Sequence, residues 1–187
     1  MLCYQLSNSY QNLKHWITNS GLIISNPDEE HYGGVYSYFD EDKKKYSFLY
    51  PEITGYSASS LSFFYNNSKD DNLLKLAKAN SNWIIQIFKK AKIRTSLFIN
   101  PSIRDIKLSS ELNVDCVEIH TGKLSNLVKL KKNFNEELNR IKKSSILAKK
   151  LNIEVHAGHG LDYKTTKILT KINEIQEFNI GHFIIGE

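Results

Sequence analysis

From Arg94 to the end of the chain, short apolar runs alternate with amphipathic stretches, and this alternation restricts the fold more than any other feature of the sequence. Apolar runs bounded by Gly, Pro or Asn are typical of buried strands, whereas apolar positions that recur at spacings of three and four predict helices. Strands joined through helices have right-handed crossovers and lie parallel to one another. The sequence therefore predicts an α/β fold with a parallel sheet in this half of the chain.

Four strands and three intervening helices are expected from these patterns. The strands are predicted at Ser96 to Asn100, Val114 to His120, Ile153 to Ala157 and Phe178 to Ile185. The last strand contains a glycine, Gly181. The helices are predicted at Ile103 to Leu112, Glu136 to Leu151 and Asp162 to about Ile172.

The first ninety or so residues differ from the C-terminal half in composition and in apolar spacing. Nearly all the tyrosines lie there, and the apolar spacing is helical. Helices are predicted at Asn8 to Asn19, Thr54 to Tyr65 and, most strongly, Asp70 to Lys90. Two acidic residues at the start of the third helix favour its N-terminus through the helix dipole. We expect a small, mainly helical, aromatic-rich segment over residues 1–91 and a second domain over residues 92–187.

The net charge of +5 comes mostly from lysines in short clusters, which raises the question of a nucleic-acid partner. These clusters fall on the exteriors of predicted helices and in loops, with no aromatic side chains interleaved for base stacking. We interpret them as solvated faces and expect no nucleic-acid partner. A mildly positive field also suits a phosphorylated small substrate.

The sequence has neither an apolar run near 18 residues, as a membrane span needs, nor a secretory signal over Met1 to Tyr10. The two cysteines, Cys3 and Cys116, lie far apart and match no metal-binding spacing. Cys116 sits in an apolar strand pattern, where it is expected to be a small buried hydrophobic residue. A reducing cytoplasm is the expected location.

Candidate functional residues follow the predicted strands, because the loops at the carboxyl ends of parallel strands carry the chemistry of such folds. The second strand delivers Glu118 and His120, and the loop after the third strand places His159 between two glycines. Glu118 is either a functional carboxylate or a buried one paired with a lysine, and His120 could simply cap its strand. His159 is the better candidate for a general acid, since histidine exchanges protons near neutral pH.

Two further histidines have structural and functional interpretations. His156 alternates with Glu154 along the third strand and is interpreted as structural. Gly181-His182 could be a packing kink, or a place where the backbone approaches a phosphate closely. A metal site from His156, His159 and His182 lacks a carboxylate pattern, so no metal is expected.

Four strings in the C-terminal half resemble pyridoxine 5′-phosphate synthase in order and spacing. The four strings are Arg94-Thr-Ser-Leu-Phe-Ile-Asn-Pro101, Val117-Glu-Ile-His-Thr-Gly122, Glu154-Val-His-Ala-Gly-His-Gly-Leu161 and Phe178-Asn-Ile-Gly-His-Phe-Ile-Ile185. The resemblance covers about residues 93–187. It implies a partial TIM (β/α)₈ barrel, with four parallel strands that match strands five to eight.

The resemblance also implies a reaction, namely the condensation of 1-deoxy-D-xylulose 5-phosphate with 3-amino-2-oxopropyl phosphate in vitamin B6 biosynthesis. No metal or organic cofactor is implied. His159 matches the family's proton donor, and Glu118 matches a carboxylate that stabilises the transition state. Gly160, Gly181 and His182 match positions that bind the aminoketone phosphate, so phosphorylated small molecules are the expected partners.

Other motifs of the family are missing from the sequence. An Asn-Ile-Asp-His-like first strand and a His-x-Arg-Glu-Asp run on the second do not occur. We therefore expect an incomplete barrel with little or no activity as a lone chain, and a homo-oligomer if the half barrel is to close. At His156 the family often has asparagine.

The N-terminal segment weakly resembles a hairpin of (α/α)₆ toroid proteins, many of which act on carbohydrates. The strings that carry this resemblance are Gly33-Gly-Val-Tyr-Ser-Tyr38, Tyr50-Pro-Glu-Ile-Thr-Gly-Tyr56 and Leu73 to Trp83. The alternative function is thus a carbohydrate-binding fragment, with Glu52 as its candidate residue, fused to a non-catalytic half barrel. A plain aromatic-rich helical pair explains the same strings.

Overall fold

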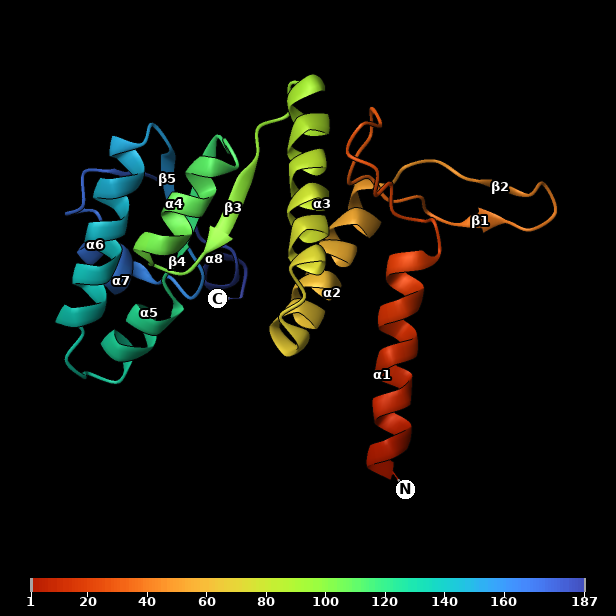
Figure 1. The fold of residues 1–187 in the computed structure, drawn as a ribbon. Coiled ribbons are helices and arrows are strands. Elements are labelled where there is room, and N and C mark those ends of the chain that lie inside the picture. The colour runs from red at the N-terminus through yellow and green to blue at the C-terminus, as the bar shows by residue number, and fades with distance from the viewer. Residues whose placement is uncertain (1, 187) are drawn as a thin grey trace. The chain divides into compact units, whose positions relative to one another are not determined.

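In the computed structural model, which describes residues 2–186, the chain divides into two units, Met1–Ala91 and Lys92–Glu187 (Figure 1). The first unit contains the helices α1 (Leu2–Asn19), α2 (Pro51–Ser68) and α3 (Asp71–Lys90). A loop with the short antiparallel strands β1 (Phe39–Asp40) and β2 (Lys45–Tyr46) joins α1 to α2. This unit is mainly helical.

The core of the first unit lies between α2 and α3 and the loop that precedes them. Leu61 and Phe64 on α2 and Leu73 on α3 are almost fully buried there. Helix α2 is longer than predicted, because Pro51 suits the first helical turn and Lys69 ends the helix in a left-handed conformation with φ of 57°. Asp70 caps α3 by accepting a hydrogen bond from the backbone N–H of Asn72.

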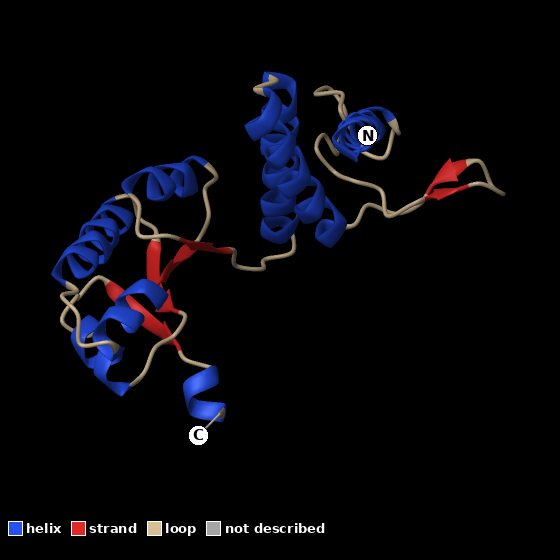
Figure 2. Ribbon diagram, turned by 90° about the horizontal axis from the view of Figure 1, so that it is seen from below, coloured by secondary structure: helices blue, strands red, loops and turns tan. Residues whose placement is uncertain are grey.

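The second unit confirms the predicted α/β fold. Its parallel sheet has the order β3-β4-β5-β6, formed by β3 (Ser96–Ile99), β4 (Cys116–His120), β5 (Glu154–Gly158) and β6 (Ile175–Asn179). The crossovers contain α4 (Ile103–Glu111), α5 (Gly122–Lys129), α6 (Asn135–Lys150) and α7 (Tyr163–Leu169). Figure 2 shows helices gathered along one side of this sheet.

The two faces of the sheet differ in chemistry. One face is apolar, and its side chains have an exposed fraction of 0% at Val117, Ile119, Val155 and Ala157. Because side chains alternate along a strand, the neighbouring positions point to the opposite face. There the register aligns a row across all four strands that consists of Phe98, Glu118, His156 and Glu177. Helices thus cover the apolar face, and the polar face carries the candidate residues.

The fourth strand, predicted at Phe178 to Ile185, is wrong beyond Asn179. Strand β6 ends at Asn179, and residues 182–185 form a short helical turn, α8 (His182–Ile185), with Gly181 at its N-cap. A short apolar run cannot be assigned to strand or helix by periodicity alone. Ile185 is 86% exposed, so this run is not a buried strand, and Gly181 lies outside the sheet rather than inside it.

Helix α5 was missed, because Thr121-Gly122 was interpreted only as the end of a strand. The spacing of Leu124, Leu127 and Val128 has the helical period and could have revealed it. Cys116 is buried, as predicted, with an exposed fraction of 3%, and the side chain of Cys3 lies outside the described part of the chain. No helix among residues 2–186 has the length and apolar character to cross a bilayer.

Candidate active site

Glu118 is held on the polar face of the sheet by a neighbour two strands away. The amide Nδ2 of Asn179, at the end of β6, donates a hydrogen bond of 2.7 Å to Glu118 Oε2. The carboxylate lies over Gly158 on the intervening strand, where a Cβ would collide with Glu118 Oε1. Strand β5 therefore needs a glycine at this point, because the carboxylate occupies the space of a side chain.

His159 follows β5 in a strained turn. Its φ is +76°, in the left-handed region that few residues besides Gly, Asn, Asp and His adopt, and Gly160 has a φ of +72°. Buried Thr121 holds this turn, because its hydroxyl lies 2.6 Å from the carbonyl oxygen of Gly158 and 2.9 Å from that of His159. Such a conformation persists only where surrounding contacts fix the backbone, as Thr121 does here. Six other non-glycine residues among those described also have a positive φ, so this conformation alone does not mark a functional site.

The imidazole ring of His159 stacks on that of His120. The ring centroids are 4.4 Å apart with an angle of 26° between the planes, and the ring of Phe98 lies 5.2 Å from His120. The backbone N–H of Gly122 donates a hydrogen bond of 3.3 Å to His120 Nδ1, and this bond orients the His120 ring. A Cβ on Gly122 would lie 2.7 Å from atoms of both rings, so only glycine leaves room for them.

The side chains of Glu118 and His159 thus lie on the same side of the sheet. Glu118 and His120 are two residues apart on β4 and share a face, and His159 stacks on His120. The sequence interpretation depended on this placement, since side chains on opposite faces would have excluded a common site. Their catalytic roles remain predictions.

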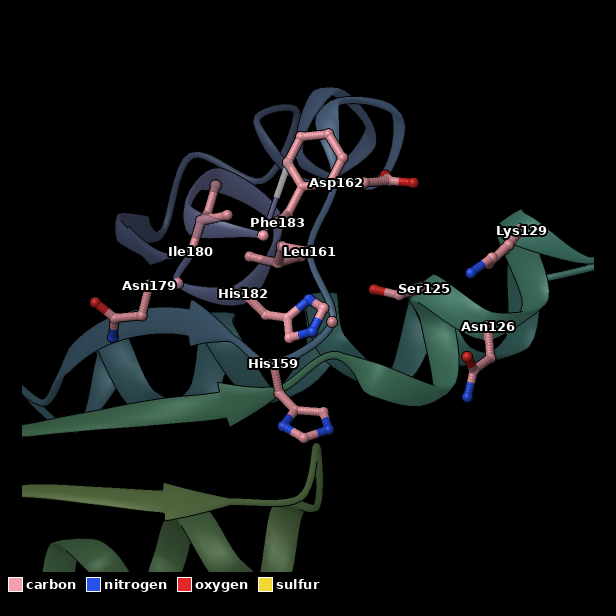
Figure 3. Close-up of a pocket in the computed structure, with 13 residues that line it drawn as sticks. Ser125, Asn126, Lys129, His159, Leu161, Asp162, Asn179, Ile180, His182 and Phe183 are labelled. Atoms are coloured by element: carbon pink, nitrogen blue, oxygen red, sulfur yellow. The ribbon is translucent and has the colours of Figure 1, made fainter.

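A cavity of about 810 Å³ opens at this end of the sheet (Figure 3). It is lined by four of the five residues that the sequence singled out, namely His159, Gly160, Gly181 and His182. Glu118 does not line it, but Asn179, which binds the Glu118 carboxylate, does. Residues far apart in sequence therefore converge on one cavity.

Helix α5 contributes lining residues that the sequence analysis did not name. Ser125, Asn126 and Lys129 face the cavity from the side opposite β6 (Figure 3). They were missed because the helix itself was missed. Its helical spacing would have placed Ser125 and Lys129, one turn apart, on the same side.

His156 takes part in a separate polar cluster on the sheet. Its Nε2–H donates to Glu154 Oε1 at 2.8 Å, and Arg94 Nη2 donates to Glu154 Oε2 at 2.7 Å. The hydrogen bond from His156, with Arg94 adding to it, holds the pKa of the Glu154 carboxyl below its usual value. His156 does not line the cavity, and the described residues contain no group of three or more His, Cys, Asp or Glu side chains placed to hold a metal ion.

Glu52, the candidate residue of the N-terminal segment, lies exposed in the first turn of α2. It accepts hydrogen bonds from the hydroxyl groups of Tyr50, at 2.9 Å, and Tyr56, at 3.3 Å. The hydrogen bond to Glu52 raises the pKa of Tyr50 above its usual value. These contacts satisfy all three side chains, and a carbohydrate function for this segment remains a prediction.

Comparisons with known proteins agree with the resemblance in the C-terminal half. Residues 73–187 match the family described as "Pyridoxal phosphate biosynthesis protein PdxJ". The match begins in α3, about twenty residues before the first of the four resembling strings, at Arg94.

Among the relatives is the pyridoxine 5′-phosphate synthase of Pelagibacter ubique, 63% identical over 116 residues, which are 62% of this chain and 48% of that protein. The synthase of Zymomonas mobilis is 48% identical over 97 residues, 52% of this chain and 37% of that protein. That of Sulfurihydrogenibium is 46% identical over 102 residues, 54% and 41% of the two chains. This chain thus spans half or less of the length of these relatives.

The matched residues include β3 to β6, the strained His159 turn and the cavity, so the shared sequence and the candidate site coincide. The chain belongs to the PdxJ family of pyridoxal phosphate biosynthesis proteins.

Proposed function

We propose that residues 92–187 supply the proton-donating and phosphate-binding side of a pyridoxine 5′-phosphate synthase site. The reaction would be the condensation of 1-deoxy-D-xylulose 5-phosphate with 3-amino-2-oxopropyl phosphate. The observation that carries the proposal is the convergence of His159, Gly160, Gly181 and His182 on one cavity. Family membership and the name shared by the relatives support it.

His159 is the proton donor in this proposal. His159 is exposed at the cavity. The hydroxyl of Thr121 donates a hydrogen bond to its carbonyl oxygen, and stacking on His120 orients its imidazole ring. A fixed donor needs no reorganisation when a leaving oxygen must be protonated. The anchored carboxylate of Glu118 stabilises positive charge that develops in the transition state.

The phosphate of the aminoketone substrate would bind at Gly160, Gly181 and His182. Gly160 has a positive φ, and the space where a Cβ of Gly181 would lie is open to 4 Å. Glycines with such free surroundings let backbone N–H groups approach an anion closely. His182 adds an imidazole donor at the same wall.

The other half of the site must come from further strands. Within the described sheet, β3 and β6 each pair on one side only, and exposed strand edges favour pairing with other strands. A second copy of the chain could close the barrel. In a twofold-symmetric pair, β3 of each copy would lie beside β6 of the other, so both exposed edges would be paired. A cytoplasmic location, like the homo-oligomer, remains a prediction from sequence.

Complementation tests this function directly. The part of the Pelagibacter ubique synthase that this chain does not match would be co-expressed with the chain, and formation of pyridoxine 5′-phosphate measured from the two substrates. We expect turnover with the wild-type chain and a loss of at least about a hundredfold with His159→Ala, since general acid catalysis contributes about that much or more.

Two controls make the result decisive. The relative's own two halves, co-expressed in the same way, show whether split barrels assemble. If they turn over substrate while the pairing with this chain does not, or if His159→Ala retains full activity, the proposed function is wrong.

A further inference from the structure

Ser125, on α5, has a buried hydroxyl group with no hydrogen-bond partner among the described residues. The residue is 7% exposed, and its Oγ is shielded from solvent. Two other buried helical serines of this unit donate to the carbonyl four residues back, Ser109 to Asp105 at 2.8 Å and Ser145 to Ile141 at 2.9 Å, whereas Ser144 on α6 does not. A buried, unpaired polar group is costly, and it indicates a bound ligand only where the group also borders a cavity.

The hydroxyl faces the cavity. Ser125 is one of the lining residues, and Figure 3 shows its oxygen directed toward the side of the cavity where His182 lies. A Cβ built on Gly160 would be 3.7 Å from Ser125 Oγ, so the hydroxyl lies against the glycine turn that follows His159. The orphan group therefore adjoins the surface to which the proposed function assigns a phosphate.

Lys129 adds a positive charge one helical turn later. It is exposed, lines the same cavity, and has no ion-pair partner in the part of the chain that the structure describes. The carboxylate of Asp162 also lines the cavity, but it accepts a hydrogen bond of 2.7 Å from the backbone N–H of Thr165 as the cap of α7. A hydroxyl donor, an ammonium group, an imidazole and glycine backbone surround the space.

We propose that Ser125 Oγ and Lys129 Nζ bind the phosphoryl group of the substrate, opposite Gly160, Gly181 and His182. The inference rests on the proposed function and deepens it, because it assigns α5 as the second wall of the phosphate site. The hydroxyl donates one hydrogen bond to a phosphoryl oxygen, and the ammonium group offsets the dianionic charge.

Binding of inorganic phosphate to the full chain tests this assignment, measured by calorimetry and by thermal shift. Glycerol 3-phosphate, run in parallel, distinguishes a site for phosphate monoesters from one for free phosphate alone. We expect Ser125→Ala to weaken binding by roughly three- to tenfold, the worth of one hydrogen bond. Lys129→Gln is expected to weaken binding similarly and to reduce its dependence on salt concentration.

Ser144→Ala is the matched control. Ser144, on α6, is also a buried serine with an unpaired hydroxyl, with an exposed fraction of 1%, but it does not line the cavity. Its removal should leave phosphate affinity unchanged. Melting curves without phosphate, compared for the two alanine variants, show whether each folds normally.

Equal phosphate affinity in Ser125→Ala and wild type overturns the inference, as does the absence of phosphate binding to the wild-type chain. An equal loss in Ser144→Ala would also overturn it, because the effect would then be one of general packing. The proposed function is judged separately by the His159→Ala turnover experiment, since His159→Ala deletes the proton donor and retains both α5 groups.

Discussion

Replacing Gly158 by alanine tests the geometry that holds the Glu118 carboxylate in place. The new methyl group would collide with Glu118 Oε1 and would lie 2.8 Å from Glu118 Cδ and 3.2 Å from Asn179 Cβ. Glu118 must then rotate away, and the hydrogen bond from Asn179 is lost. The substitution therefore acts on the carboxylate and its partner together.

The expected cost follows from these contacts. Rotation of the flexible Glu118 side chain relieves the collision at small cost, and loss of its hydrogen bond costs about 0.5–1.5 kcal/mol. The contact of 3.2 Å with Asn179 Cβ requires a small shift of β6, which adds about 1 kcal/mol. Replacing glycine in a strand recovers about 0.5–1 kcal/mol through the unfolded state. We expect Gly158→Ala to lower the free energy of unfolding of the second unit by about 1 kcal/mol, a melting shift of roughly 5 °C for a unit of this size.

Gly181→Ala is the control, because no atom lies within 4 Å of the position that its Cβ would take. It should change stability by less than about 0.5 kcal/mol. Both tryptophans, Trp16 and Trp83, lie in the first unit, so their fluorescence follows that unit, and far-UV circular dichroism is needed to follow the second.

The reasoning would be refuted by a Gly158→Ala protein as stable as wild type, or by an equal loss in Gly181→Ala. The first result would mean that the carboxylate of Glu118 does not occupy the space over Gly158, and the second that the loss of stability does not arise from the collision there.

Three further outcomes are expected. Asp162→Ala should cost about 1 kcal/mol at pH 7, because the helix α7 loses its cap. Hydrogen bonds, first that from the backbone of Thr165, lower the pKa of Asp162 in the folded state, so this stability is present above about pH 4 and is lost as the pH falls through the folded pKa. Urea unfolding at several pH values should show the difference between variant and wild type vanish over that range. Leu61→Ala, which empties a fully buried site in the first unit, should cost about 2–5 kcal/mol in the unfolding transition followed by tryptophan fluorescence, and a cost near zero would contradict the assigned core. Gly122→Ala should separate the His120 and His159 rings, since its methyl would lie 2.7 Å from both; loss of the upfield ring-current shifts of their NMR signals would show this, and unchanged shifts would argue against the stack.

Much of the second unit could be predicted, because its signals are local. The apolar pattern of Val117 and Ile119 places β4 in a sheet, and the glycines around His159 mark a turn after β5. The apolar run after Gly181 was misread, since a run of three apolar residues has no periodicity that separates a strand from a helical turn. Family motifs added what periodicity cannot, namely which strand-end residues to examine.

The sequence alone thus determined the fold class, the strand order in the chain and the residues that follow the first three strands, because strand and helix periods are properties of a few consecutive residues. Only the tertiary structure decided that Asn179 fixes Glu118 across 61 positions of sequence, that His120 stacks on His159, and that the hydroxyl of Ser125 is left unpaired at the cavity. These contacts depend on the register of neighbouring strands and on how the crossover helices pack, and no local pattern encodes either.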